Sequence, residues 1–205
     1  RHAAQGLAER AGARVTRLLA PEHGVAAAEQ DMVEVGETRD PISGLPVVSL
    51  YGCDESSLAP RPEVLDDVDV VVADLADVGA RYYTFVATLV RTMEVAAAAG
   101  CRVVVADRPN PIGGEVVEGP RIAEGYFSFV GELPVSNRHG MTVGELARLA
   151  RARRCPDLEL HVVPVEGWRR EQWWNETGLP WVAPSPNMPT LDTAGVYPGA
   201  CLIEA

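Results

Sequence analysis

The sequence contains no lysine, so all 18 of its basic residues are arginines, against 29 aspartates and glutamates and a net charge of −11. This acidic balance argues against binding to nucleic acid or to an anionic membrane, because phosphate groups are bound by basic patches. Its apolar stretches are far too short to span a membrane. Cys53, Cys101, Cys155 and Cys201 form no C-x-x-C pair, which leaves a zinc site or a thioredoxin-type redox site without support.

The most informative stretch of the chain runs from Val68 to Tyr83. Its first part is an almost unbroken run of valines, which favours a central parallel strand covered on both faces. The run ends at acidic residues, with Asp74 and Asp77 followed by Gly79 and Arg81. Ligands in open α/β sheets bind outside the carboxyl ends of the strands, so this loop is the first candidate for a site.

Strand and helix patterns alternate along the chain, which predicts an α/β fold with a Rossmann-like, mostly parallel sheet and helices on both faces. Apolar runs predict strands, and apolar positions at helical spacing predict helices that end at glycine or begin at a capping residue. Residues 25–45 lack a clear period and are expected to form a long loop. The expected strands are 14–20, 46–50, 68–72, 102–106 and 158–163, and the expected helices are 2–12, 84–99 and 142–153.

A change in composition near residue 164 predicts a domain boundary, because Trp168, Trp173, Trp174 and Trp181 all follow it closely. Residues 1–163 are then the Rossmann-like domain and residues 164–205 the beginning of a smaller second domain. The chain opens with a helix and closes without a finished supersecondary unit. We therefore expect a strand upstream of residue 1 and a continuation of the second domain beyond residue 205.

Six short blocks, in this order, resemble the NamZ-type exo-β-N-acetylmuramidases, and the likeness covers nearly all of the chain. The blocks are residues 21–24 (PEHG), 49–52 (SLYG), 77–84 (DVGARYYT), 107–111 (DRPNP), 138–142 (RHGMT) and 185–190 (SPNMPT). The resemblance implies a Rossmann-like amino-terminal domain, a smaller carboxyl-terminal domain and an active cleft between them. It also implies a bacterial enzyme of cell-wall recycling, extracellular or in the cell envelope, that releases N-acetylmuramic acid from the non-reducing ends of peptidoglycan fragments.

Glycoside cleavage uses one carboxyl group as an acid and a second as a nucleophile or base. Glu22 is the residue that best matches a catalytic glutamate of the family, and it follows the expected strand 14–20 directly. Glu118 and Asp74 are the candidates for the second catalytic carboxylate, with Asp77 as a further possibility, whereas Glu94 falls within the expected helix 84–99 and is better explained as a helix-surface charge. Each of these acids has a simpler interpretation, as a solvated loop residue or as an acceptor for its own turn.

Substrate binding is assigned to polar and aromatic residues of the same blocks. Arginine binds a carboxylate through two parallel hydrogen bonds, so arginines suit the lactyl group of muramic acid, although each could form a structural ion pair instead. Asparagine could contact sugar hydroxyls or an acetamide, and could equally build turns. The candidates for substrate binding are His23, Asp77, Arg81, Tyr82, Arg108, Asn110, His139 and Asn187.

Three other functions are compatible with parts of the sequence. A non-catalytic module that binds cell-wall sugars is the main alternative, because tryptophans often form the wall of a sugar site, although core packing is the simpler explanation. A nucleotide-binding Rossmann protein is disfavoured because no G-x-G-x-x-G motif is present. A metal hydrolase would use His23, His139 and Asp74, but their spacing is not that of metal ligands, so no metal and no cofactor are expected. The oligomeric state is left open.

Overall fold

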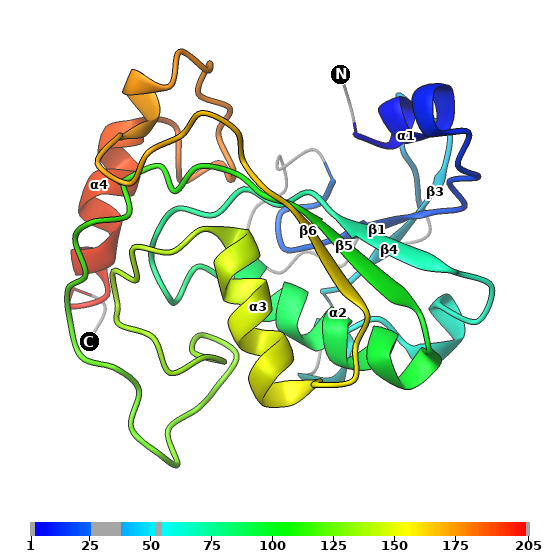
Figure 1. Cartoon of the computed structure of the whole chain (residues 1–205), viewed down its shortest axis with the longest axis horizontal. Coiled ribbons are helices and arrows are strands. Elements are labelled where there is room, and N and C mark those ends of the chain that lie inside the picture. Colours follow the sequence, from blue (N-terminus) through cyan, green and yellow to red (C-terminus); the bar gives the residue numbers. More distant parts are fainter. Residues whose placement is uncertain (1–2, 26–37, 52–54, 204–205) are drawn as a thin grey trace.

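The computed structural model describes residues 3–25, 38–51 and 55–203 of the 205-residue chain. Strands and helices alternate along most of it (Figure 1). The strands are β1 (Leu18–Ala20), β2 (Thr38–Arg39), β3 (Pro46–Ser49), β4 (Val70–Ala73), β5 (Arg102–Ala106) and β6 (Leu160–Val163). The α-helices are α1 (Ala3–Ala11), α2 (Phe85–Ala99), α3 (Val143–Arg154) and α4 (Leu191–Ala200), and short 3-10 turns occupy Glu55–Leu58, Pro62–Val64 and Trp174–Glu176.

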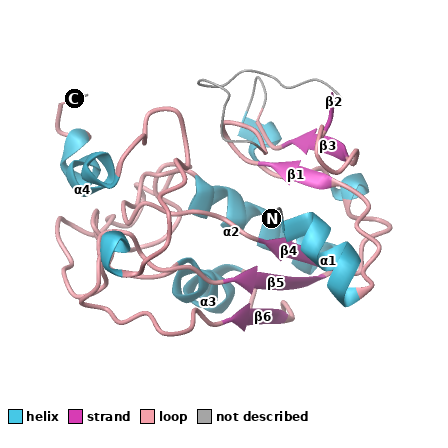
Figure 2. Cartoon of the chain, turned by 90° about the horizontal axis from the view of Figure 1, so that it is seen from above, coloured by secondary structure: helices cyan, strands magenta, loops and turns pink. Residues whose placement is uncertain are grey.

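The strands form two small sheets, with the order β1-β3-β2 in one and β4-β5-β6 in the other. All neighbours are parallel except β2 and β3, which are antiparallel. In Figure 2 the strands β4, β5 and β6 lie side by side and point the same way, toward the loops that carry the candidate site residues. The expected α/β class with mostly parallel strands is therefore confirmed.

Helices α2 and α3 pack together against one face of the β4-β5-β6 sheet, and α1 lies on the other side of the strands (Figure 1). The core between them is aliphatic, and Met93 of α2 and Val103 and Val105 of β5 are completely buried. The ends of these helices follow from the sequence. Gly100 ends α2 in the left-handed conformation with φ of 71°, and Thr142 begins α3 with a complete capping box.

Two expectations about the strands need correction. The valine run forms β4, but β4 lies at one edge of its sheet within the described residues, and Val72 is 39% exposed. A valine run predicts a strand, but it does not show which neighbours will cover it. The expected loop 25–45 contains strand β2, which pairs with β3 through only two residues, too short a segment to show a period. Residues 26–37 of that loop lie outside the described part of the chain.

A second apolar cluster joins the end of the chain to the loop after β4. Met188 and Ala194, from the last segment, pack with Val78, Tyr83 and Ile112. Helix α4 was not expected from the sequence, because it contains Pro198 and has little amphipathic character. Across residues 3–25, 38–51 and 55–203, none of the helices has the length and apolar character needed to span a membrane.

Candidate active site

The loop 77–84 is the point at which the sequence blocks come together. Within it, Asp77 faces His139 of the fifth block, with Oδ2 and Nε2 3.2 Å apart. At its end, Thr84 donates a hydrogen bond of 2.5 Å from Oγ1 to Oε2 of Glu22 in the first block. Tyr51 of the second block lies close enough to Thr84 and Glu22 for both to influence the pKa of its phenol. Segments far apart in the sequence therefore meet above the ends of the parallel strands.

Two further blocks reach the same loop through close packing. Gly79 has φ of +83°, and a Cβ on it would lie 2.7 Å from Oδ1 of Asn110 and 2.6 Å from Cγ1 of Ile112. Only glycine fits this combination of backbone conformation and close approach. The Tyr83 hydroxyl lies beside that of Ser185 in the sixth block, in a geometry that falls short of a hydrogen bond. The other five blocks thus all reach residues 77–84.

Glu22 lies on a tight turn that directs it toward α2. The turn is closed by a hydrogen bond of 3.1 Å from the Gly24 amide to the Pro21 carbonyl. His23 has φ of 70°, a conformation that non-glycine residues rarely adopt and that is enriched at functional sites. The His23 ring lies 6.5 Å from that of Phe85, the first residue of α2. The fold therefore places both of these predicted site residues, Glu22 and His23, against the start of α2.

Asp77 and His139 form a buried pair, with only 4% and 1% of their side chains exposed. Asp77 Oδ2 also accepts a hydrogen bond of 2.9 Å from the amide of Gly79, and the Met141 amide donates to His139 Nδ1 at 3.1 Å. Since Nδ1 is an acceptor, Nε2 carries the proton, and it faces Asp77 in a geometry that falls short of a hydrogen bond. The third and fifth blocks are therefore in contact through this buried pair.

The adjacent tyrosines of the third block have different surroundings. Tyr83 is only 4% exposed, and burial raises the pKa of its phenol well above the ordinary value, with further increases from the charges of Asp77 and Glu22. Tyr82 is half-buried, and its hydroxyl donates to the backbone carbonyl of Tyr197 in α4. Burial also raises the pKa of Tyr82 well above its ordinary value. Tyr83, which was left out of the candidate set, is thus the tyrosine that lies near both acids.

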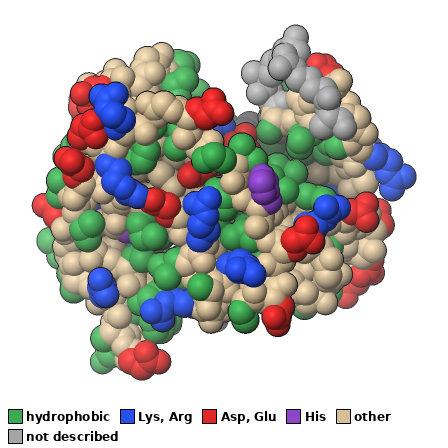
Figure 3. Space-filling model, viewed as in Figure 1, with side chains coloured by type: hydrophobic (Ala, Val, Ile, Leu, Met, Phe, Trp, Pro, Cys, Tyr) green, Lys and Arg blue, Asp and Glu red, His purple; other side chains and the backbone are tan. Residues whose placement is uncertain are grey.

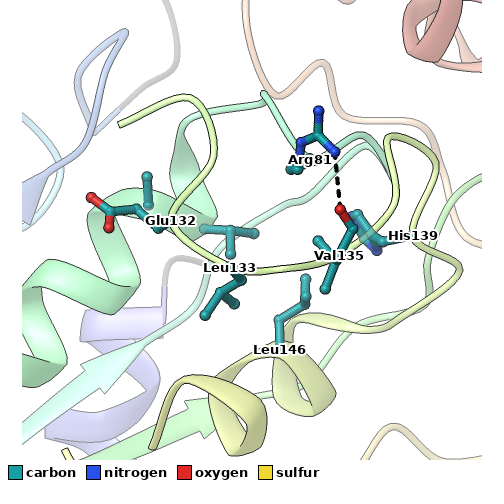
Figure 4. Close-up of a pocket in the computed structure, with 8 residues that line it drawn as sticks. Arg81, Glu132, Leu133, Val135, His139 and Leu146 are labelled. Carbon is teal, nitrogen blue, oxygen red and sulfur yellow. Dashed lines mark hydrogen bonds between the residues drawn. The ribbon is translucent and has the colours of Figure 1, made fainter. Parts of the chain in front are cut away.

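The arginines of the blocks are all engaged within the protein. Arg81 donates to the carbonyls of Pro120 and Val135 at 2.8 and 3.0 Å, and Figure 4 shows it among the residues, His139 included, that line a small pocket. Burial lowers the pKa of its guanidinium below the ordinary value. Arg108 pairs with Asp74 at 2.6 Å, and both side chains are partly exposed. Arg108 is therefore the arginine more easily released toward an anionic substrate.

Glu118 lies at the rim of this region. Its carboxylate pairs with Arg138 at 2.8 Å, and 64% of its side chain is exposed. The Arg138 guanidinium also lies 5.6 Å from the centre of the Trp173 ring, a cation–π contact. The carboxylates expected to act together thus have separate partners: Thr84 for Glu22, Arg108 for Asp74 and Arg138 for Glu118.

The candidate asparagines differ in their exposure. Asn110 is 2% exposed, with its side-chain amide donating to the Met141 carbonyl and its Oδ1 accepting from the Ile112 amide. These contacts are those of a turn-building residue. Asn187 is exposed, in the turn closed by the Met188 amide and the Ser185 carbonyl. Within the described ranges, histidine, cysteine, aspartate and glutamate side chains form no group of three arranged to hold a metal ion.

Sequence reasoning missed Tyr51, Thr84 and Ser185 as residues of the site. Each of them lies inside one of the six blocks, so their position in a block, and not their chemical type, could have identified them. In Figure 3 the surface is hollowed between the side of the molecule that carries α4 and the side that carries α1. Of the six blocks, the third and the fifth contribute Arg81 and His139 to the lining of the small pocket drawn in Figure 4.

The model of one protein family, described as the N-terminal region of the exo-β-N-acetylmuramidase NamZ, matches residues 1–192. The chain belongs to this NamZ family. It is 45% identical over 191 residues to the peptidoglycan β-N-acetylmuramidase NamZ of Bacillus subtilis (strain 168), covering 93% of this chain and 45% of that protein. The resemblance inferred from the six blocks is confirmed.

Two crystal structures of DUF1343 family proteins from Bacteroides fragilis have the same fold. One has a TM-score of 0.86 and 37% identity, and covers 98% of this chain and 50% of its own. The other has a TM-score of 0.80 and 32% identity, and covers 100% of this chain and 52% of its own. The chain thus spans about half the length of the NamZ relatives that it matches.

Proposed function

We propose that the protein containing this chain is an exo-acting glycoside hydrolase that releases N-acetylmuramic acid from the non-reducing ends of peptidoglycan fragments. The observation that supports this most is the placement of Glu22, whose carboxylate meets Thr84 at 2.5 Å where the six blocks converge. The B. subtilis relative is a peptidoglycan β-N-acetylmuramidase. Peptidoglycan-derived saccharides are accordingly the partners that we propose.

In this proposal Glu22 is a catalytic carboxylate, and Asp74 and Glu118 remain the candidates for the second. Both candidates are exposed enough to change partners when substrate binds, because their arginine pairs lie at the surface. Asp77 is assigned a supporting role with His139, since the pair is almost completely buried. Arg108 is the residue that we assign to an anionic group of the sugar.

We also propose that the chain divides near residue 164. The last segment stays outside the core between α2, α3 and the sheet: Met188 and Ala194 pack instead in the second apolar cluster, where they contact the loop after β4. Residues 1–163 would form the Rossmann-like domain, and residues 164–205 the start of a second domain that contributes Ser185 and α4 to the site.

The function is tested by measuring the release of N-acetylmuramic acid from a MurNAc-GlcNAc disaccharide by the full-length protein. Glu22→Gln is expected to lower kcat by about 100- to 10,000-fold, the usual contribution of a general acid or base. Glu94→Gln is the matched control, because Glu94 lies on α2 and pairs with Arg154. No release by the wild type, or equal rates for wild type and Glu22→Gln, would contradict the proposal. Binding without turnover would favour the sugar-binding module.

Asp74→Asn and Glu118→Gln, assayed in the same way, identify the second carboxylate. The variant that loses kcat by a factor similar to that of Glu22→Gln marks the partner. A loss shared equally by both would indicate that neither acts alone with Glu22.

A further inference from the structure

Thr84 begins α2 in an unusual way. Threonine at the start of a helix normally accepts a hydrogen bond from a backbone amide of the first turn. Thr142 does so for α3 and Thr190 for α4. Thr84 makes no such capping bond, and its hydroxyl is directed instead to Oε2 of Glu22 at 2.5 Å. Helix α2 therefore begins without a side-chain cap, and the Thr84 hydroxyl donates to the Glu22 carboxylate, 62 residues away in the sequence.

Tyr51 approaches the same carboxylate from the end of β3. It is 6% exposed, and burial raises the pKa of its phenol well above the ordinary value, so the hydroxyl remains protonated and available as a donor. Its ring is fixed by an edge contact with Phe129, whose centroid lies 5.6 Å away. The Arg91 guanidinium lies 5.1 Å from the Phe129 ring centre and is held in turn by Glu132 at 2.7 Å. The direction of the Tyr51 hydroxyl is therefore set by packing.

The backbone of Glu22 is constrained as well. The turn that follows it contains His23 at φ of 70° and Gly24 at φ of 75°. A left-handed non-glycine residue persists only where surrounding contacts hold it in place. Backbone and carboxylate of Glu22 are thus fixed independently, the first by this turn and the second by Thr84, with the Tyr51 phenol nearby.

We propose that Thr84 and Tyr51 are positioning residues that hold the Glu22 carboxylate in its reactive orientation. The inference rests on the proposed function and adds two residues to the reaction. Holding Oε2 prevents rotation of the carboxylate and leaves Oε1 as the oxygen that we assign to the substrate. Neither hydroxyl touches substrate in this assignment, so each acts only through Glu22. A misplaced catalytic group loses rate even when substrate still binds.

The first experiment compares three α2 variants in the full-length enzyme, with the MurNAc-GlcNAc disaccharide as substrate. Thr84→Val keeps the shape of the side chain but removes the hydroxyl, and is expected to lower kcat about 10- to 100-fold with KM nearly unchanged. Thr84→Ser keeps the hydroxyl and is expected to retain a rate close to that of the wild type. Thr92→Val is the control, because Thr92 is buried two turns further along α2 and away from Glu22.

Tyr51→Phe removes the second donor while the ring that packs on Phe129 stays in place. It is expected to lower kcat as Thr84→Val does, by a factor of about 10. Tyr126→Phe is its control, since Tyr126 is 78% exposed. The thermal midpoint of every variant is recorded by circular dichroism. If Thr84→Val does not fold, Tyr51→Phe and Thr84→Ser still decide the proposal.

A double mutant separates a positioning role from a merely structural one. If Thr84 acts only through Glu22, adding Thr84→Val to Glu22→Gln produces no further loss of kcat. The proposal is overturned if Thr84→Val and Tyr51→Phe match the wild type, if Thr84→Ser is as slow as Thr84→Val, or if Thr84→Val reduces the Glu22→Gln rate by its full factor. A wild-type protein that releases no sugar would instead overturn the proposed function.

Discussion

Two layers of the molecule differ in the side chains of their interiors. The core between α2, α3 and the strands β4, β5 and β6 is apolar, whereas the loops above the ends of these strands, here called the loop layer, bury charged and polar side chains. The core of the first layer consists of aliphatic side chains, Met93 and two cysteine thiols. In the described residues, the buried side-chain polar atoms without a hydrogen-bond partner lie, apart from one on Trp174, within 77–83 and 137–139. Polar groups buried without partners are rare because they cost free energy, so their concentration marks the loop layer as built for chemistry.

The buried pair gives the largest test of this difference. His139→Ala leaves Asp77 buried without its partner and is expected to lower the free energy of unfolding by about 3–5 kcal/mol. It should also lower kcat, because Asp77 lies in the loop that ends at Thr84. Urea denaturation measures the first effect, and disaccharide turnover below the unfolding transition measures the second. A change in unfolding free energy below about 1 kcal/mol would show that the pair contributes little to stability, and unchanged turnover would show the same for kcat.

The aliphatic layer should respond in stability alone. Met93 is completely buried, and Met93→Ala is expected to cost about 2–5 kcal/mol through lost burial and the cavity left behind. The turnover of the molecules that stay folded should be unchanged, since the core of α2 lies away from Glu22. A matching loss of kcat, measured where circular dichroism shows the variant to be folded, would mean that the layers are coupled.

Gly79→Ala tests the contact between two sequence blocks. The new Cβ would have to sit at φ of +83° and within 2.7 Å of Asn110 Oδ1, so we expect a loss of about 1–3 kcal/mol together with reduced turnover. Gly44→Ala is the matched control, because Gly44 has φ of +71° but no atom within 4 Å of the added Cβ. The difference between the variants in urea denaturation isolates the steric part. Equal losses would show that the close approach has no energetic weight.

How much the sequence could predict also differs between the layers. Strand β5 was predicted at its observed bounds, and α2 within one residue, because their patterns and the stop at Gly100 are local. The two-residue β2 was not predicted, because its pairing with β3 is a tertiary contact with too little local signal. Local patterns therefore describe the aliphatic layer well.

In the loop layer the sequence singled out segments that the fold brings together, but not the partners of their side chains. Glu22 and Asp77 were singled out, but nothing local connects Glu22 to Thr84 or Asp77 to His139, 62 residues away in each case. Arg81 was expected to bind a carboxylate, because guanidinium suits one. In the fold, the Arg81 guanidinium donates instead to two backbone carbonyls. The partner of each side chain depends on how the loops pack together. Loop packing leaves no periodic pattern in a single sequence.

Thr142 provides the smallest test, because it belongs to a sequence block but lies against the aliphatic layer. Its hydroxyl accepts from the Glu145 amide at 3.3 Å and donates to Asp107 Oδ2 at 2.8 Å, so it caps α3. Thr142→Ala is therefore expected to cost about 1 kcal/mol of stability, the usual value of a helix cap, with kcat unchanged. Thr142→Ser, which keeps the hydroxyl, should restore most of the urea midpoint. If kcat instead fell in Thr142→Ala and recovered in Thr142→Ser, Thr142 would belong with Thr84 and the loop layer would extend to the start of α3.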